Sequence, residues 1–381
     1  MKIITSNFIH ILAALALGSA AGASPSPEVI VLRTPDDGIQ PVAEADTAGN
    51  VHLLYFRGEP AHGNLFYTVR RQGADQFEPA VRVNTQDDCA IAIGTIRGAQ
   101  LAIGRDGYIH VAWMGSSNTR PEKEHHLTPM LYTRSIDGGK TFEPERNLIT
   151  ESYGLDGGGA IAADSTGRVD VFWHAGKPDS GEVGRQIWVT RSSDDGKTFA
   201  KEVPAWDEST GVCGCCGMTA GASAGRSWVM YRAATDKVNR DIYLLGSDGA
   251  TLKFSGQKLD QWETDSCPMS AMSLGFSGNA TAAAWETKEG DVAYTIAGTD
   301  LHGRVPHDKV KRKYPDVALA PDGHTLLAWI DGAGWNKGGQ LSWQMFDSKA
   351  NPIGQLKTIG DSAVWTKPAA VYNGDAFLII Y

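Results

Sequence analysis

The sequence has 381 residues, of which 44 are glycine and 11 are tryptophan, and its formal net charge at pH 7 is −9. Acidic residues outnumber basic ones by 44 to 35, and the one dense basic run, at 309–313, is most simply a solvated loop, which argues against a nucleic-acid partner. Abundant glycine, strand-like alternation of apolar and polar residues, and little helical periodicity predict an all-β chain with many tight turns.

The first 23 residues have the features of a signal peptide. Lys2 precedes an apolar run over residues 8–17, and small residues follow it up to Ala23. The run is too short to span a membrane, and no later segment is long enough either. We therefore expect cleavage between Ala23 and Ser24, a periplasmic or secreted protein without a membrane span, and a single domain over residues 24–381.

A two-strand pattern repeats along the rest of the chain. After a lone strand over residues 28–33, each unit has a short segment of small or apolar residues, a glycine-containing turn, and an apolar strand that ends in an aromatic residue. Seven units end in this way, at Tyr55, Trp113, Trp173, Tyr231, Trp285, Trp329 and Tyr381. A second hairpin follows most of them. Inner and outer hairpins that alternate along a chain are typical of a β-propeller, whose inner strands crowd a central channel and so favour small residues.

The last of the seven units ends the chain and has no outer hairpin of its own. We expect the strand over residues 28–33 to complete this final sheet and close the ring. The repeat count therefore favours seven four-stranded blades.

Two eight-residue segments share the pattern Ser-x-Asp-x-Gly-x-Thr-Phe. They start 57 positions apart, which is the length of one four-stranded sheet with its turns, and their shared residues are Ser135, Asp137, Gly139, Thr141, Phe142, Ser192, Asp194, Gly196, Thr198 and Phe199. Asp and Gly supply side-chain-to-backbone hydrogen bonds and a positive φ, Ser and Thr can bond across the turn, and Phe can pack on the sheet beneath. The pattern predicts a self-contained structural turn rather than a catalytic device.

This motif resembles the Asp box, or BNR repeat, of the sialidase (neuraminidase) superfamily. The resemblance implies a sialidase-like propeller, and since known sialidases have six blades it implies six rather than the seven that the repeat count favours. A second resemblance, to secreted bacterial sialidase-like proteins, rests on the segments 211–218, 231–243, 267–269 and 334–339. It supports the same fold and leaves the reaction open.

Propeller topology predicts which loops meet. The loop before each inner strand and the loop after each second strand lie on one rim, and the Asp-box turns lie on the other. Ionisable and aromatic residues at these places are expected to surround one opening and to suit a small polar ligand such as a saccharide; those singled out are Arg57, Arg97, Asp156, His174, Arg232, Glu286, Tyr314 and Trp365.

The sialidase resemblance implies roles for these residues. Sialidases hold a substrate carboxylate with three arginines, and Arg57, Arg97 and Arg232 would form that clamp, since guanidinium groups match a carboxylate bidentately. Tyr314 would be the nucleophile, Glu286 its base and Asp156 the acid/base, with His174 and Trp365 as further substrate contacts. The Arg-Ile-Pro segment with which sialidases open is absent here.

Four of the five cysteines, Cys213, Cys215, Cys216 and Cys267, are expected on the same rim, and Cys89 lies apart. In an exported protein we expect a disulfide, for instance from Cys216 or Cys215 to Cys267, that ties neighbouring blades. The alternative is a soft-metal site for copper or zinc built from the clustered thiolates.

The sequence therefore predicts an exported, sialidase-like, monomeric propeller that binds, and as a glycoside hydrolase would cleave, a saccharide at the channel rim, with no required cofactor. A copper- or zinc-binding propeller and a non-catalytic protein-binding propeller remain the alternatives.

Overall fold

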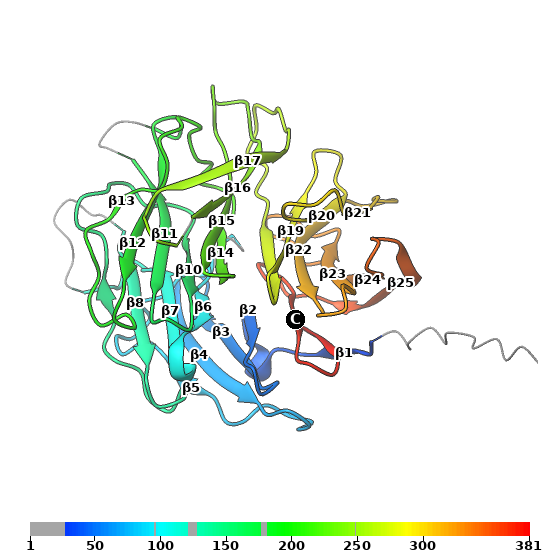
Figure 1. Cartoon of the computed structure of the whole chain (residues 1–381), viewed down its shortest axis with the longest axis horizontal. Coiled ribbons are helices and arrows are strands. Elements are labelled where there is room, and N and C mark those ends of the chain that lie inside the picture. The colour runs from blue at the N-terminus through cyan, green and yellow to red at the C-terminus, as the bar shows by residue number, and fades with distance from the viewer. Residues whose placement is uncertain (1–26, 95–96, 121–127, 177–180, 248) are drawn as a thin grey trace, which may run out of the picture.

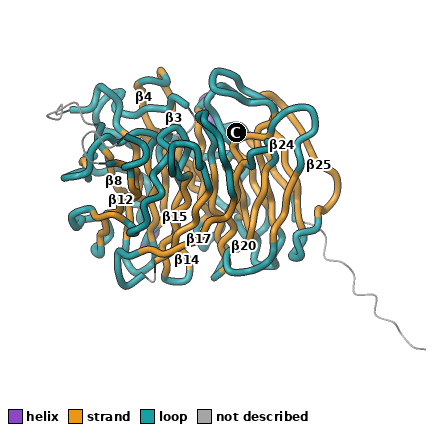
Figure 2. Tube along the Cα trace, turned by 90° about the horizontal axis from the view of Figure 1, so that it is seen from above, coloured by secondary structure: helices purple, strands orange, loops and turns teal. Residues whose placement is uncertain are grey.

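The computed structural model describes residues 27–94, 97–120, 128–176, 181–247 and 249–381. These residues form seven β-sheets with two short 3₁₀ turns, Pro35–Asp37 and Arg105–Gly107. The sheets follow one another around an axis (Figure 1) and stand side by side with loops at both edges (Figure 2). The signal peptide expected over residues 1–23 lies outside the described residues.

Six of the seven blades are four-stranded antiparallel sheets whose strands are consecutive in the chain. The first three blades contain β2 (Ile39–Ala45), β3 (Val51–Glu59), β4 (His62–Arg70) and β5 (Val81–Arg82); β6 (Gln100–Ile103), β7 (Ile109–Met114), β8 (Met130–Ser135) and β9 (Arg146–Asn147); β10 (Gly159–Ala163), β11 (Val169–Ala175), β12 (Gln186–Ser192) and β13 (Val203–Pro204). The next three contain β14 (Thr219–Ser223), β15 (Arg226–Arg232), β16 (Ile242–Ser247) and β17 (Phe254–Asp260); β18 (Met272–Ser277), β19 (Ala280–Glu286), β20 (Val292–Ile296) and β21 (His302–Val305); β22 (Arg312–Leu319), β23 (Thr325–Asp331), β24 (Gln340–Phe346) and β25 (Pro352–Asp361).

The seventh blade joins the two ends of the chain. β1 (Val29–Leu32) pairs in parallel with β27 (Phe377–Ile380), which pairs antiparallel with β26 (Ala369–Tyr372). The predicted seven-bladed, all-β ring closed by the N-terminal strand is confirmed, and the six blades implied by the sialidase resemblance are wrong. The closing blade differs from the prediction in one respect, because within the described residues it has three strands rather than four.

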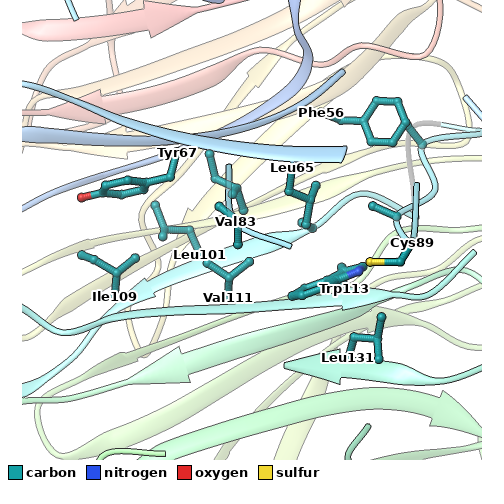
Figure 3. Close-up of a cluster of buried hydrophobic side chains, with 14 of the residues drawn as sticks. Phe56, Leu65, Tyr67, Val83, Cys89, Leu101, Ile109, Val111, Trp113 and Leu131 are labelled. Atoms are coloured by element: carbon teal, nitrogen blue, oxygen red, sulfur yellow. The ribbon is translucent and has the colours of Figure 1, made fainter. Parts of the chain in front are cut away.

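The aromatic residues near the ends of the second strands stabilise the contacts between blades. All seven are buried, and they pack between adjacent blades. In the contact between the first two blades, Phe56, Leu65 and Tyr67 meet Leu101 and Trp113, with Cys89 beside the indole of Trp113 (Figure 3). Each blade thus buries both faces against its neighbours, and the burial of apolar surface around the ring stabilises the fold.

Both Ser-x-Asp-x-Gly-x-Thr-Phe segments form the self-contained turn that their pattern predicts. In the first, the Asp137 carboxylate accepts hydrogen bonds from the backbone N–H of Thr141 (3.0 Å), the Thr141 hydroxyl (2.6 Å) and the Ser135 hydroxyl (2.7 Å), and these bonds hold the Asp137 pKa at about 2. Gly139 has φ +86°, and a Cβ there would lie 2.0 Å from the Tyr67 ring. Phe142 packs edge-on to the same ring at 5.6 Å, so the turn braces the preceding blade rather than its own.

The inner strands of the blades surround a central channel. A cavity of about 670 Å³ runs along them, and alanine and glycine are its commonest lining residues, which fits the prediction of small residues on the inner strands. No helix in the described ranges is long and apolar enough to cross a membrane.

Candidate functional site

One rim of the ring carries most of the residues singled out in the sequence. Because consecutive strands in a blade are antiparallel, the connection from second to third strand and the connection to the next blade lie on the same side. Side chains from different blades meet there: Arg97, before the second blade, contacts Asp156, before the third, and Lys313, at the start of the sixth, contacts Glu286, at the end of β19.

Glu286 is a buried carboxylate of this rim, with 2% of its surface exposed. Its Oε1 accepts the backbone N–H groups of Tyr314 at 2.9 Å and Ala271 at 3.2 Å, and its Oε2 accepts the Lys313 ammonium at 2.5 Å. Burial is the largest single influence and would lower the pKa of Lys313, but the charge and hydrogen bond of Glu286, with smaller contributions from Tyr314 and Cys216, together raise it. The structure thus brings Tyr314 and Glu286 together through the tyrosine backbone, and the Lys313 ammonium lies 5.4 Å from the centre of the tyrosine ring.

Arg232 is a buried cation at the end of β15, with 1% of its surface exposed. Its guanidinium donates to the Ser270 hydroxyl at 2.9 Å and to the carbonyl oxygens of Arg240 and Glu286 at 2.5 and 3.3 Å. Its carbon lies 4.2 Å from the centre of the Trp262 ring. Arg232 therefore braces the rim from beneath.

The two other arginines of the expected clamp lie in different surroundings. Arg57 is about half exposed and pairs with Asp36 at 3.5 Å, with its guanidinium above Phe66. Arg97 pairs with Asp156 at 2.7 Å. Among the described contacts, the three arginines share no partner.

His174 and Trp365 also lie at this rim. His174 is 1% exposed, and neither ring nitrogen has a hydrogen-bond partner among the described residues. Burial, followed by the charge of Arg185, lowers the pKa of His174 to about 4. Trp365 is half-buried with φ +59°, and its carbonyl oxygen accepts a hydrogen bond from Gln40 at 3.0 Å.

The cysteines do not form the expected disulfide. All five cysteines, each within the described residues, are free, which corrects the prediction of a bond from Cys215 or Cys216 to Cys267. The loop before β18 explains the difference, because it places the exposed Cys267 away from the cluster and Ser270 against it, with the Ser270 hydroxyl 3.6 Å from the Cys216 sulfur. The Cys213 sulfur lies 3.2 Å from that of Cys215 and 3.4 Å from that of Cys216.

The three clustered sulfurs are unequal in acidity. Burial disfavours the Cys216 thiolate, but hydrogen bonds with Cys213 and Cys215 and the charge of Arg232 outweigh burial and lower its pKa well below the ordinary value. Hydrogen bonding to Cys213 and Cys216, together with burial, raises the pKa of Cys215. The surroundings therefore favour the thiolate form at Cys216 and the thiol form at Cys215.

A pocket of about 330 Å³ opens on this rim between the loop before β18 and the start of β22. Its lining includes an aromatic ring, hydroxyl groups and one buried ion pair, from Trp262, Thr264, Ser266, Thr287, Glu286 and Lys313. Of the lining residues, the sequence pointed to Glu286 and Cys267. Trp262 was missed because it lies in a loop outside the repeat pattern. Lys313 was missed because it belongs to a basic run that was interpreted as a solvated loop, although it lies in β22. The nearness of both to Glu286 is a tertiary contact.

The channel holds further charged groups that the sequence did not indicate. Glu44, Asp316 and Lys367 lie among its small lining residues. Burial raises the pKa of Glu44 to about 7 in spite of a hydrogen bond from the Ile103 N–H. Burial also raises the pKa of Asp316 and lowers that of Lys367, and each charge partly offsets the shift of the other.

Comparison with known proteins yields likeness in structure but not in sequence. No protein-family model and no curated protein matches the chain. Among solved structures, a Hadza microbial sialidase matches with a TM-score of 0.51 at 12% identity over 82% of this chain and 69% of the other. An α-L-arabinanase from Penicillium chrysogenum, complexed with arabinobiose, matches with a TM-score of 0.53 at 13% identity over 85% and 98%. An ulvan lyase with a bound saccharide matches with a TM-score of 0.52 at 14% identity over 88% and 86%. At such identities the likeness shows the fold.

Proposed function

We propose that the protein binds a saccharide in the rim pocket around Trp262. The observation that carries the proposal is the composition of this pocket, in which a half-buried indole stands beside hydroxyl groups and the Glu286–Lys313 pair. An aromatic face suits the C–H face of a sugar ring, and fixed polar groups around it suit the sugar hydroxyls. The volume of about 330 Å³ is at the small end for a ligand pocket, which suits one sugar unit.

The likeness in fold to the sialidase, the arabinanase and the lyase adds support, because each of these proteins is described as acting on a saccharide or as holding one. Fold likeness alone does not identify the sugar. The choice of pocket therefore rests on the side chains of this chain.

The contacts favour recognition over hydrolysis. In the catalytic form of the proposal, Glu286 would take the phenolic proton of Tyr314 and Asp156 would act as acid/base, both of which require free carboxylate oxygens. Here both oxygens of Glu286 already accept hydrogen bonds, one of them from Lys313 at 2.5 Å, and Asp156 pairs with Arg97. We also propose export, which would place the protein where extracellular glycans occur.

The test is binding to a panel of mono- and oligosaccharides, sialosides included, measured by calorimetry on the full mature chain. Trp262→Ala should weaken binding about tenfold or more, a loss of about 1.4 kcal/mol. Trp228→Ala is the matched control, since Trp228 is also half-buried and also lies beneath a guanidinium, that of Arg226 at 5.9 Å, but on β15 away from the pocket.

Fluorogenic glycosides assayed on the same samples separate recognition from hydrolysis. We expect no turnover, and turnover abolished by Tyr314→Phe would instead establish the catalytic form. Equal saccharide binding by Trp262→Ala and the unsubstituted protein would show that the pocket around Trp262 is not the binding site.

A further inference from the structure

Three sulfur atoms from one short loop meet at the rim outside the saccharide pocket. The metal-ligating atoms of Cys213, Cys215 and Cys216 all lie within 4.8 Å of one another. Cys213 and Cys216 are 1% and 2% exposed, whereas Cys215 is half-buried. Together with Ala234 the three side chains form a small apolar cluster of their own. The arrangement is a sulfur-lined site with one accessible side.

The spacing of the sulfurs suits a shared ion. The measured separations of 3.2 and 3.4 Å exceed the length of a disulfide bond, about 2.04 Å. Sulfurs that share an ion at bond lengths of about 2.3 Å lie roughly 3.8–4.0 Å apart. The three side chains therefore need to move by only a few tenths of an ångström to ligate one ion, and the loop backbone can stay in place.

The positive charge of Arg232 favours an anion at the cysteine cluster. Among the described residues, no carboxylate lies in direct ion-pair contact with the buried Arg232, and Asp260 interacts with its charge from farther away. A buried charge without a close counter-charge is costly. The Nε of Arg232 donates to the Ser270 hydroxyl, which in turn donates to the Cys216 sulfur. Through these two hydrogen bonds, the positive charge of Arg232 stabilises negative charge on the Cys216 sulfur.

Two more cations are affected by the charge of the cluster. Against the effect of burial, the charges of Cys213 and Cys215 help to raise the pKa of Arg240, which is 5% exposed, and the charge of Cys216 helps to raise the pKa of Lys313. Each is already paired with a carboxylate, Glu182 at 3.0 Å and Glu286 at 2.5 Å. Of these three cations, Arg232 is thus the one without a carboxylate in direct contact, and the sulfurs would supply a close counter-charge.

We propose that Cys213, Cys215 and Cys216 bind one copper(I) ion in a three-coordinate thiolate site. Thiolates are soft ligands that select copper(I), zinc or iron–sulfur clusters. A structural zinc site takes four protein ligands, whereas the group found among the described residues contains three sulfurs and no fourth His, Cys, Asp or Glu. Three sulfurs in an apolar enclosure suit copper(I), which needs no fourth ligand.

Binding is a ligand exchange without electron transfer. The ion leaves its solution ligands, three copper–sulfur bonds form, and the thiol protons still present on the cluster pass to buffer; copper stays in the +1 state. The exposed side of Cys215 is the route by which the ion reaches the buried sulfurs. Three thiolates around a monovalent ion leave a charge of −2, which Arg232 and its neighbours balance.

The test is anaerobic titration of the reduced full mature chain with copper(I), buffered by a chromophoric copper(I) chelator. We expect one copper(I) per chain. Cys215→Ser should abolish stoichiometric uptake, and it is the preferred ligand variant because Cys215 is the least buried of the three and its hydroxyl replacement fits the same space. Cys267→Ser and Cys89→Ser are the matched controls, and both should bind copper(I) as the unsubstituted protein does.

Ser270 is proposed as a positioning residue that acts through Cys216. Ser270→Ala should weaken copper(I) binding about tenfold, as is typical of a group that supports a ligand, and Ser270→Thr, which keeps the hydroxyl, should restore it. A purely structural role for Ser270 would change unfolding without changing the affinity for copper(I).

Three outcomes would overturn the proposal. These are copper(I) uptake unchanged in Cys215→Ser, uptake lost in Cys267→Ser, and stoichiometric zinc binding with no preference for copper(I). Thiol titration of the denatured, unreduced protein adds a fourth outcome. A disulfide within the cluster, together with failure of the reduced protein to take up copper(I), would show a redox pair rather than a metal site.

Discussion

The guanidinium carbon of Arg232 lies 4.2 Å from the centre of the Trp262 ring. This contact connects the two proposed sites on the rim, since Trp262 lines the proposed saccharide pocket and Arg232 reaches the cysteine cluster through Ser270. A cation over an indole that is shielded from water contributes about 2 kcal/mol. One buried arginine therefore holds both sites in place.

Replacement of Arg232 by methionine is expected to lower the free energy of unfolding by about 2–4 kcal/mol, because the Arg240 and Glu286 carbonyl oxygens lose a buried donor. Urea unfolding followed by fluorescence measures the change. Arg226→Met is the control, because Arg226 lies over Trp228 but is exposed, and its effect should stay within about 0.5 kcal/mol. Equal losses in the two variants would contradict the special role of Arg232.

Stability should fall in mild acid because of His110. Burial, followed by the charge of Arg134, lowers the pKa of His110 to about 3, and its Nδ1 bonds the Tyr132 hydroxyl at 2.8 Å. Since the folded pKa lies below the ordinary value of about 6.5, the unfolded chain binds more protons between these values. The contribution of His110 is thus neutral above pH 6.5 and becomes destabilising as the pH falls, reaching about 3 kcal/mol by pH 4.

His110→Gln should remove this part of the pH dependence. The measurement is the free energy of unfolding in urea at several pH values from 7 to 4, compared between variant and unsubstituted protein. The exposed His302 provides the control substitution, His302→Gln. Parallel curves for His110→Gln and the unsubstituted protein would show that His110 is not held neutral.

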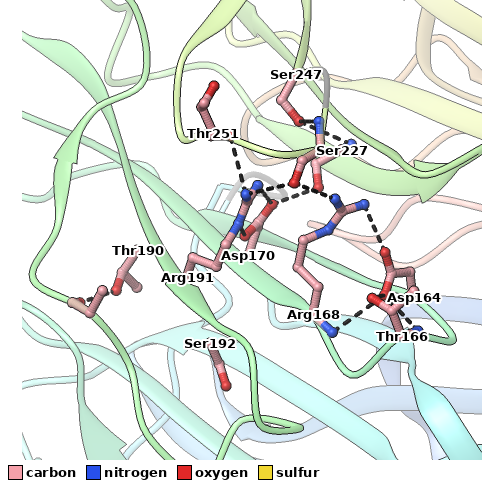
Figure 4. A network of polar contacts seen from close by, with 12 residues as sticks. Asp164, Thr166, Arg168, Asp170, Thr190, Arg191, Ser192, Ser227, Ser247 and Thr251 are labelled. Atoms are coloured by element: carbon pink, nitrogen blue, oxygen red, sulfur yellow. Dashed lines mark hydrogen bonds and ion pairs between the residues drawn. The ribbon is translucent and has the colours of Figure 1, made fainter.

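A buried ion pair on the opposite rim joins the third and fourth blades (Figure 4). Asp170, 0% exposed, receives two bonds from Arg191, at 2.7 and 2.8 Å, and one from the Ser227 hydroxyl at 2.5 Å. Asp170→Asn leaves the Arg191 charge buried and unpaired, so we expect a loss of about 3–5 kcal/mol in the free energy of unfolding.

The control for Asp170 is an ion pair of similar length on the surface. Arg71 and Glu78 pair at 2.7 Å with about half of each side chain exposed, so Glu78→Gln should cost less than about 1 kcal/mol. Thermal unfolding by calorimetry ranks the two variants, and a ranking with Glu78→Gln as the more damaging would refute the account.

Closure of the ring by β1 can be tested with proline. Leu32 pairs with Ile380, and its carbonyl accepts the Tyr381 N–H at 3.1 Å, so the parallel register turns the Leu32 N–H towards β27 as well. Leu32→Pro removes that donor and should cost about 2 kcal/mol. In Val31→Pro, one residue earlier, the N–H that is lost lies on the outer side of an edge strand, so this variant should cost less. Urea unfolding compares the two variants.

The repeated pattern was sufficient to predict most of the fold. The blade count, the closure by the N-terminal strand and the two Ser-x-Asp-x-Gly-x-Thr-Phe turns follow from strand alternation, turn residues and the aromatic residue near the end of each second strand, such as Trp113 and Trp329. The six blades implied by the sialidase resemblance were wrong because a shared turn motif specifies a hairpin, and the number of hairpins is a property of the whole chain.

The site was predictable only in part. Glu286 and Tyr314 were placed on one rim by counting strands, but the bond between them runs to the tyrosine backbone, and Lys313 occupies the other carboxylate oxygen. The expected disulfide failed for the same reason: alignment of the blades set Cys267 opposite Cys216, whereas the loop before β18 presents Ser270 there. The roles of Arg57, Arg97 and Asp156 stay predictions.

The sequence by itself determined the architecture, because a strand, its turn and its partner lie within some tens of residues, and each unit repeats the same local chemistry. Only the tertiary structure decided which rim side chains touch, since loops from different blades carry no period and their paths depend on packing against neighbours far away in the chain. Only the tertiary structure decided the contacts among Arg232, Trp262, Ser270 and Cys216.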